Sequence, residues 1–232
     1  WIEAGSASFA ERHYPFEKNA ALETFFPPDF IIEYTGQIRA WFYVLHVIAN
    51  ALYKSEAFKN VLVTGVILGT DGRKMSKNYG NYPDPKQLLK KYGGDALRLY
   101  LLGSPVMKGE DILISEEQYR MQVRGLLLVL WNVYNFFISN ALVDRWLPNR
   151  HSGKPKAHPE SGGDSGQARM TRANVLDRWI LSLLQKLIEG VTKDLESYDT
   201  VSSIDRIKKF IDNLSTWYIR RSRDRVGPTA ED

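Results

Sequence analysis

The residues best suited to chemistry are two lysines, Lys74 and Lys77, in a glycine-containing segment that directly follows an apolar, β-branched run. Two ammonium groups on such a loop suit a polyphosphate, because charge that develops on phosphate oxygens needs positioned cations. A solvated basic turn would contain the same residues, so that interpretation stays open. The segment is not a P-loop, since Gly-x-x-x-x-Gly-Lys-Ser/Thr does not occur in the chain.

The elements that must position this loop alternate in type. Buried strands are predicted at 30–34 and 61–68, and a helix with one apolar face at 38–52. Two further helices are predicted at 86–92 and 95–102, the first opened by the N-cap Asp84 and by Pro85. This order predicts a parallel α/β sheet.

After about residue 112 the predicted elements are all helices. One covers 116–142, one begins at Asn174 with Asp177 as a capping-box partner, and the last is capped by Ser202 or Ser203. Residues 148–172 contain no Val, Ile, Leu, Phe, Tyr or Trp, which predicts a flexible loop. The second half is therefore expected to form an antiparallel helical bundle.

Composition excludes several classes of protein. The 232 residues are 44% hydrophobic and 25% charged, as in ordinary globular proteins. There are no cysteines, and the four histidines show no His-Glu-x-x-His pattern, so we expect neither disulfides nor a bound metal such as zinc. A net charge of +4 does not by itself indicate nucleic-acid binding.

No membrane span or signal peptide is expected. The longest apolar stretch, 126–138, contains Asn132 and Asn135 and is shorter than the roughly 18–20 apolar residues that a span needs. The chain opens on Trp1 rather than on an initiator methionine, which suggests a piece of something longer.

The run Lys74-Met75-Ser76-Lys77-Asn78 resembles the Lys-Met-Ser-Lys-Ser signature of class I aminoacyl-tRNA synthetases, with Asn78 in place of the final serine. Further runs resemble the isoleucyl-tRNA synthetases of that class, and they lie at 1–6, 28–33, 36–43, 81–85, 92–100 and 217–225. The resemblance covers nearly everything except 148–172. It implies the second half of a Rossmann-type nucleotide-binding domain at 1–111, followed by an all-α, truncated anticodon-binding domain at 112–232.

The implied activity is that of a cytoplasmic ligase. It would activate isoleucine with ATP and Mg²⁺ to isoleucyl-adenylate, and then transfer the acyl group to tRNA(Ile). By resemblance, Lys74 and above all Lys77 would be catalytic, binding the leaving pyrophosphate. Met75 and Ser76 would shape the ATP-binding loop.

The resemblance also assigns two binding regions. Gly65 and Val66, with Ile67, would offer backbone to the adenine, although an ordinary core strand fits Val66 equally well. The residues expected around the aminoacyl-adenylate are Trp1, Glu33, Gln37 and Trp41. Core packing is the alternative for Trp41. The family often has Gly-x-Asp-Gln where this chain has Tyr34-Thr35-Gly36-Gln37.

An arginine cluster near the end of the chain is the candidate tRNA-binding site, through contacts with phosphates. Its members are Arg220, Arg221, Arg223 and Arg225. The alternative is a solvated helix face on which Asp212 and Asp224 neutralise the arginines. Trp217 and Tyr218 are expected in the core of the bundle.

Two parts of a complete synthetase do not occur in this sequence, namely the His-x-Gly-His signature and the editing domain. The missing N-terminal half of the catalytic domain is therefore an expected partner, in the same polypeptide or in another, and the chain alone is expected to be inactive. A valyl- or leucyl-tRNA synthetase, or a non-catalytic tRNA-binding module, stays open as an alternative.

Overall fold

The computed structural model describes residues 1–17, 21–143 and 174–226. These residues form two compact units, Trp1–Glu116 and Glu117–Asp232, divided a few residues after the predicted boundary at 111/112. The predicted loop at 148–172 lies outside the described residues.

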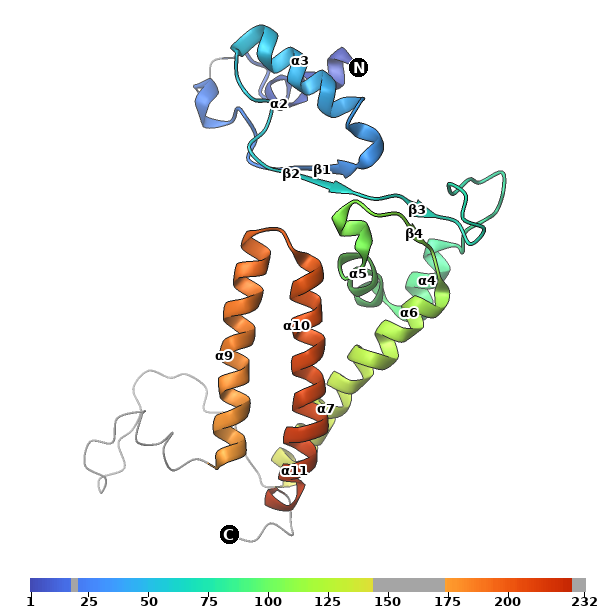
Figure 1. The fold of residues 1–232 in the computed structure, drawn as a ribbon, viewed down its shortest axis with the longest axis vertical. Coiled ribbons are helices and arrows are strands. Elements are labelled where there is room, and N and C mark those ends of the chain that lie inside the picture. The colour runs from blue at the N-terminus through green and yellow to red at the C-terminus, as the bar shows by residue number, and fades with distance from the viewer. Residues whose placement is uncertain (18–20, 144–173, 227–232) are drawn as a thin grey trace, which may run out of the picture. The chain divides into compact units, whose positions relative to one another are not determined.

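The first unit begins with a β-α-β arrangement. Strands β1 (Ile31–Tyr34) and β2 (Val61–Thr64) are parallel, with Ile31 opposite Val61 and Tyr34 opposite Thr64. Helix α3 (Trp41–Tyr53) connects them (Figure 1). Parallel strands need such a crossover, so the predicted order of elements and the parallel pairing are confirmed.

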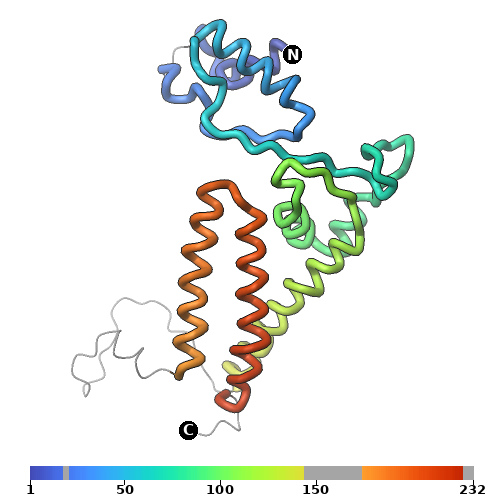
Figure 2. The backbone as a smooth tube through the Cα atoms, in the orientation of Figure 1, coloured from blue at the N-terminus to red at the C-terminus, as the bar shows by residue number. Residues whose placement is uncertain are grey.

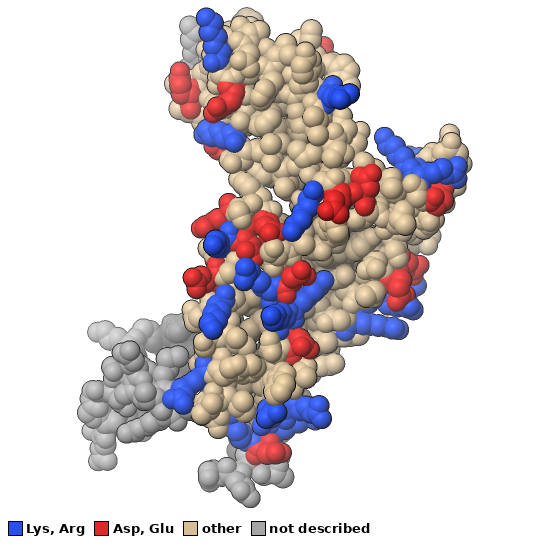
Figure 3. All heavy atoms as spheres, in the orientation of Figure 1, with Lys and Arg blue, Asp and Glu red and all other residues tan. Residues whose placement is uncertain are grey.

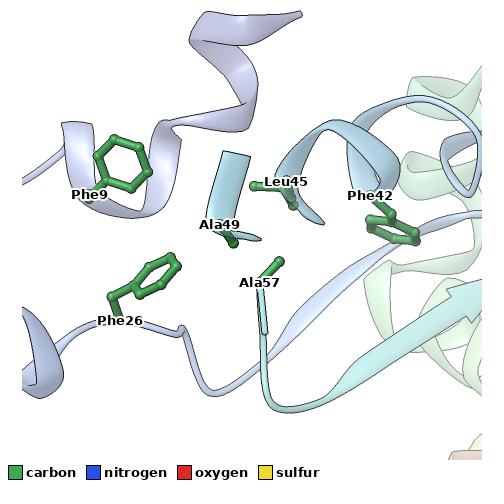
Figure 4. Packing of buried hydrophobic residues seen from close by; sticks show 6 residues of the cluster. All are labelled: Phe9, Phe26, Phe42, Leu45, Ala49 and Ala57. Atoms are coloured by element: carbon green, nitrogen blue, oxygen red, sulfur yellow. The ribbon is translucent and has the colours of Figure 1, made fainter. Parts of the chain in front are cut away.

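The core of this unit lies between α3 and the N-terminal segment. Phe42, Leu45 and Ala49 recur at helical spacing on α3, and all three are buried. They belong to one buried cluster with Phe9, Phe26 and Ala57, in which Phe42 lies at the side away from Phe9 (Figure 4). The ring of Phe9 meets that of Phe26 edge-on, with centroids 6.1 Å apart.

The predicted strand at 61–68 is wrong in its extent. It is broken at Gly65 and Val66, and its second part, β3 (Ile67–Leu68), pairs in parallel with β4 (Ile112–Leu113) in a separate sheet. The physical reason is that Gly65 leaves the β2 ladder to bond Val106, with its amide nitrogen 2.8 Å from the Val106 carbonyl oxygen.

Two helices between β3 and β4 match the prediction. Helix α4 (Pro85–Tyr92) has its N-terminus capped by Asp84, whose Oδ1 accepts a hydrogen bond of 2.9 Å from the Lys86 amide. Helix α5 (Gly94–Leu102) ends at Gly103. The shorter helical turns of the unit are α1 (Ile2–Gly5), α2 (Ala7–Ala10) and the 3-10 turns Leu22–Thr24, Thr35–Gln37 and Pro105–Lys108.

The second unit is helical. Its first long stretch consists of α6 (Glu116–Gln122), a π-helical turn (Val123–Leu127) and α7 (Leu128–Val143). Helices α9 (Val175–Glu196) and α10 (Thr200–Asp212) run antiparallel side by side (Figure 1). After α10 the chain continues through a π-helical segment (Asn213–Ile219), α11 (Arg220–Ser222) and a 3-10 turn (Arg223–Arg225).

Two of the helix caps expected from the sequence differ from those in the structure of this unit. Asn174 caps α9 as predicted, but the carboxylate of Asp177 is directed to Tyr218 and Arg225 rather than back to the cap. Helix α10 is capped by Asp199, which accepts from the Ser202 amide at 3.0 Å, and not by Ser202 or Ser203. An aspartate one residue before the helix satisfies the orphan amides directly.

The apolar stretch in the second unit is longer than the sequence suggested. The helical stretch Glu116–Val143 has an 18-residue window of mean hydropathy 1.7, of which 6% is buried. By length and composition alone it could cross a membrane, so the predicted lack of any such stretch is not supported on that criterion. Helices of soluble proteins pass the same test.

Candidate functional site

The two lysines lie on a loop that leaves β3 and folds back on itself (Figure 2). Lys74 returns beside Leu68 in an antiparallel bridge, and the Gly69 amide donates to the Arg73 carbonyl at 2.7 Å. Gly72 turns the chain with φ of 77°, a left-handed conformation that favours glycine.

Asn81 holds this loop together from the inside. Its side chain is buried, Oδ1 accepts from the Ser76 amide at 3.0 Å, and Nδ2 donates to Asp71 Oδ1 at 2.8 Å. Nδ2 also lies 3.3 Å from the Lys74 carbonyl oxygen. One amide side chain thus connects the start, the middle and the end of the loop.

The pKa of the Asp71 carboxyl is lowered by its hydrogen-bond partners in the loop. The hydrogen bond from Asn81, then that from the Arg73 amide, lowers the pKa of the Asp71 carboxyl to about 2. The Arg73 guanidinium lies 2.7 Å from Asp71 Oδ2 and 4.6 Å from the centre of the Tyr79 ring. Asp71 therefore neutralises Arg73, the one cation of the loop that stands beside it in an ion pair.

Lys74 and Lys77 are both exposed, and within residues 1–17, 21–143 and 174–226 neither forms an ion pair. The Lys74 ammonium lies 5.9 Å from the centre of the Tyr34 ring, at the end of β1. Met75 and Ser76 are half-buried between the two lysines, and Ser76 Oγ accepts from the Asn78 amide at 3.2 Å. The loop thus presents two uncompensated ammonium groups.

A pocket of about 260 Å³ brings together four residues that sequence analysis assigned to the aminoacyl-adenylate. It is lined by Trp1, Ala4, Glu33, Gln37 and Trp41. Trp41 Nε1 donates to the Ala4 carbonyl at 2.8 Å, which ties the N-terminal segment to α3. Gln37 Oε1 accepts from the Trp41 amide at 3.2 Å, so the first turn of α3 and the pocket share this side chain.

The backbone expected to meet the adenine is partly engaged elsewhere. The Val66 amide donates to Asp111 Oδ1 at 2.7 Å, and the Val66 carbonyl accepts from the Ile112 amide at 3.0 Å. A Cβ atom on Gly65 would lie 1.9 Å from the Glu110 carbonyl oxygen, so only glycine fits there. Both polar backbone groups of Val66 are therefore already hydrogen-bonded within the chain.

The four arginines of the second unit differ in their surroundings. Arg225 pairs with Asp177 at 2.7 Å, and this contact lowers the pKa of the Asp177 carboxyl. The Arg221 guanidinium lies 4.5 Å from the centre of the Trp217 ring. Within the described part of the chain, Arg220 and Arg223 are exposed and form no ion pair.

One alternative and one expectation about this cluster are wrong. The carboxylate that pairs with an arginine is Asp177, not Asp212 or Asp224. Trp217 is 48% exposed and not in the core, because the π-helical segment turns it to the surface beside Arg221. Tyr218, expected in the core, is half-buried and donates to Asp177 Oδ1 at 3.0 Å. On the face drawn in Figure 3, acidic and basic side chains are interspersed.

Sequence reasoning missed the residues that support the site. Asn81 accepts from the Ser76 amide and donates to the side chain of Asp71, and Asp111 accepts from the Val66 amide, which is far away in the sequence. The only signal for Asn81 is its position after Gly80, where an asparagine is an ordinary turn residue. In the part of the chain that the structure describes, no group of three or more His, Asp or Glu side chains could hold a metal ion.

Comparison with known proteins agrees with this geometry. Residues 1–113 match the family described as tRNA synthetases class I (I, L, M and V), and residues 177–231 match the anticodon-binding domain of tRNA ligase. The chain belongs to the class I tRNA synthetases. The first match contains the pocket and the lysine loop, and the second contains the arginine cluster.

Among relatives of this synthetase chain are two named isoleucine–tRNA ligase. That of Protochlamydia amoebophila is 42% identical over 225 residues, which are 97% of this chain and 20% of the relative. That of Treponema denticola is 43% identical over 232 residues, which are 100% of this chain and 21% of the relative. The chain thus spans about a fifth of the length of these relatives.

Solved structures show the same class I synthetase fold. The methionyl-tRNA synthetase of Mycobacterium tuberculosis in complex with methionyl-adenylate superposes with a TM-score of 0.71 at 20% identity, covering 96% of this chain and 40% of that one. LeuRS of Agrobacterium radiobacter K84, in a ternary complex with tRNA and LeuAMS, superposes with a TM-score of 0.69 at 21% identity. The match covers 98% of this chain and 27% of that one. The predicted fold class, a Rossmann-type part followed by a helical region, is confirmed.

Proposed function

We propose that this chain belongs to an isoleucine–tRNA ligase that activates isoleucine with ATP and transfers it to tRNA(Ile). One observation carries the proposal. The Lys74 ammonium lies 5.9 Å from the ring of Tyr34, the last residue of β1, and the preceding residue, Glu33, lines the pocket assigned to the adenylate. Ligands of open α/β folds bind at this edge of the strands.

In the first step, the isoleucine carboxylate attacks the α-phosphorus of ATP, so that an acyl phosphate bond forms and pyrophosphate leaves. Mg²⁺ enters as part of the ATP substrate. Lys74 and Lys77 bind the departing pyrophosphate and offset the charge that develops on it. Among the residues that the structure describes, neither lysine has a carboxylate partner, so both charges are available for this role.

The pocket suits the amino acid. Trp1 and Trp41 provide aromatic walls for a branched alkyl side chain, and Glu33 and Gln37 provide polar atoms for the ammonium and acyl groups. Apolar walls discriminate between isoleucine and valine by only about 1–3 kcal/mol per methylene group. The choice of isoleucine over valine or leucine is supported by the names of the relatives.

In the second unit, Arg220, Arg221 and Arg223 are proposed to contact tRNA phosphates, while Arg225 is held by Asp177. An enzyme that acts on tRNA is expected in the cytoplasm. The helix at 116–143 would then lie inside a soluble enzyme rather than in a membrane. No protein-bound metal is proposed for this segment.

The test is isoleucine-dependent exchange of pyrophosphate into ATP by the full-length polypeptide, compared with valine and leucine. Lys77→Ala is expected to slow exchange by about 10²–10³-fold while tRNA binding is unchanged. Lys90→Ala, which removes an exposed lysine from α4, is the matched control and should leave exchange intact. A full-length protein that binds tRNA but catalyses no exchange would instead be a non-catalytic module.

A further inference from the structure

Two side chains of the second unit, Trp217 and Arg221, contact each other at the protein surface. The Arg221 guanidinium lies over the indole ring, 4.5 Å from its centre. Trp217 is 48% exposed, and Arg221 is exposed as well. A cation within about 6 Å of an aromatic face is attracted by the ring electrons. The indole therefore restrains the arginine side chain without neutralising its charge.

The nitrogen donors of Arg221 stay available for a ligand. Across the described residues they neither pair with a carboxylate nor hydrogen-bond to another protein group. A guanidinium presents its N–H donors in one plane, in a geometry that fits the oxygens of a phosphate. Arg221 thus combines a restrained position with an uncompensated charge.

The other arginines of the cluster lack this combination. Arg225 is held in place, but by Asp177, which compensates its charge. In the described ranges, Arg220 and Arg223 are exposed and neither pairs with a carboxylate or lies over an aromatic ring. A long side chain that is unrestrained before binding loses rotamer freedom when it binds, and this loss opposes affinity. Arg221 is spared part of that loss.

We infer that Trp217 is a positioning residue for tRNA binding, which holds the Arg221 guanidinium where it binds a phosphate of the tRNA backbone. The indole acts through Arg221 and does not itself contact the RNA. The inference rests on the proposed function, and it makes Arg221 the strongest contributor among the three arginines proposed to contact phosphates.

Trp217→Leu in the full-length enzyme tests the inference, with tRNA(Ile) titrated at several salt concentrations. We expect the Kd to rise about 2- to 5-fold, the loss of one exposed cation–π contact. The slope of log K against log salt should not change, because Arg221 still reaches the phosphate in the complex. Trp217→Tyr keeps an aromatic ring and should restore most of the affinity. Ile188→Ala, which shortens a 52% exposed side chain of α9, is the control and should leave the Kd unchanged.

Arginine variants test the same inference without changing the indole. Arg221→Ala should cost more affinity than Arg220→Ala, although each lowers the salt slope by about 0.7–0.9. Adding Trp217→Leu to Arg221→Ala should cause no further loss, because the two residues act as one unit. Isoleucine-dependent exchange, measured without tRNA, should be the same in all of these variants, which shows that each is folded.

Three results would overturn the inference and leave the proposed function intact. The first is an equal loss from Trp217→Leu with and without Arg221, since the indole would then contact the RNA directly. The second is an unchanged Kd in Trp217→Leu, and the third is an equal loss in Arg220→Ala and Arg221→Ala. A parent enzyme that binds no tRNA(Ile) would overturn both the inference and the proposed function.

Discussion

At the scale of single residues, the lysine loop depends on side chains that hold its backbone in place. Asn81 is the main example, because its buried amide bonds the backbone at Ser76 and Lys74 as well as the carboxylate of Asp71. Lys74 and Lys77 flank the Ser76 amide, so the positions of both lysines depend on this one side chain.

Asn81→Ala should therefore impair activation more than folding. Buried partners left without hydrogen bonds cost about 1–3 kcal/mol, which is enough to shift the loop into other conformations. We expect exchange by the full-length enzyme to fall about tenfold or more, and protease cleavage within 69–81 to become faster. Asn78→Ala is the control, because the contact of Asn78 with Ser76 uses its backbone amide. Equal exchange rates in the two variants would contradict this role.

The low pKa of Asp71 leads to a prediction about pH. The carboxyl titrates at about 2 in the folded loop against 3.8 for the ordinary group, so its stabilising effect is present above about pH 4 and is lost as the pH falls toward 2. A ¹³C NMR titration of the Asp71 carboxyl should give this low midpoint. In Asn81→Ala the midpoint should rise toward 3.8, because the largest cause of the shift has been removed.

At the scale of elements, two carboxylates of α9 connect this helix to later segments of the second unit. Asp177, in the first turn of α9, accepts from Tyr218 and pairs with Arg225 beyond α11. Another carboxylate, the buried Asp194 near the end of α9, pairs with Arg206 of α10 at 2.6 Å. The Asp177 contacts connect segments that are far apart in the sequence, and the Asp194–Arg206 pair joins two consecutive helices.

This arrangement separates the roles of two arginines. Arg225→Ala should lower the free energy of unfolding by about 1 kcal/mol, since it leaves Asp177 without its cation. Arg220→Ala should leave stability unchanged, weaken tRNA binding and reduce the slope of log K against log salt by about 0.7–0.9. Denaturant unfolding and tRNA titrations at several salt concentrations measure the two effects. Identical behaviour of the two variants would contradict the separation.

At the scale of the whole molecule, the chain covers about a fifth of the length of its relatives and has two compact units. The first contains the lysine loop and the pocket, and the second contains the arginines. The assignment of these units as catalytic and anticodon-binding domains stays a prediction for the full polypeptide.

The 232-residue chain by itself is expected to catalyse no isoleucine-dependent exchange. Its sequence has no His-x-Gly-His motif, the second phosphate-binding element of the family that it resembles. The purified chain should still fold, with helical circular dichroism and cooperative unfolding, so that inactivity and misfolding are distinguishable. Measurable exchange by the pure chain would refute this expectation.

Features set by neighbouring residues could be predicted from the sequence alone. The Asp84 and Asn174 caps, the helical spacing in α3 and the lysine signature all depend on residues within a few positions of one another. The resemblance to class I synthetases also depends on such short runs.

Only the tertiary structure decided what distant segments do to one another. The strand break at Gly65 follows from its hydrogen bond to Val106, the role of Asn81 from a loop that closes over its side chain, and the surface position of Trp217 from a π-helical segment. The physical reason is that packing and burial select one partner among many with similar local propensity. Trp1 and Trp41 stand 40 positions apart in the sequence, and they line one pocket because α1 packs on α3.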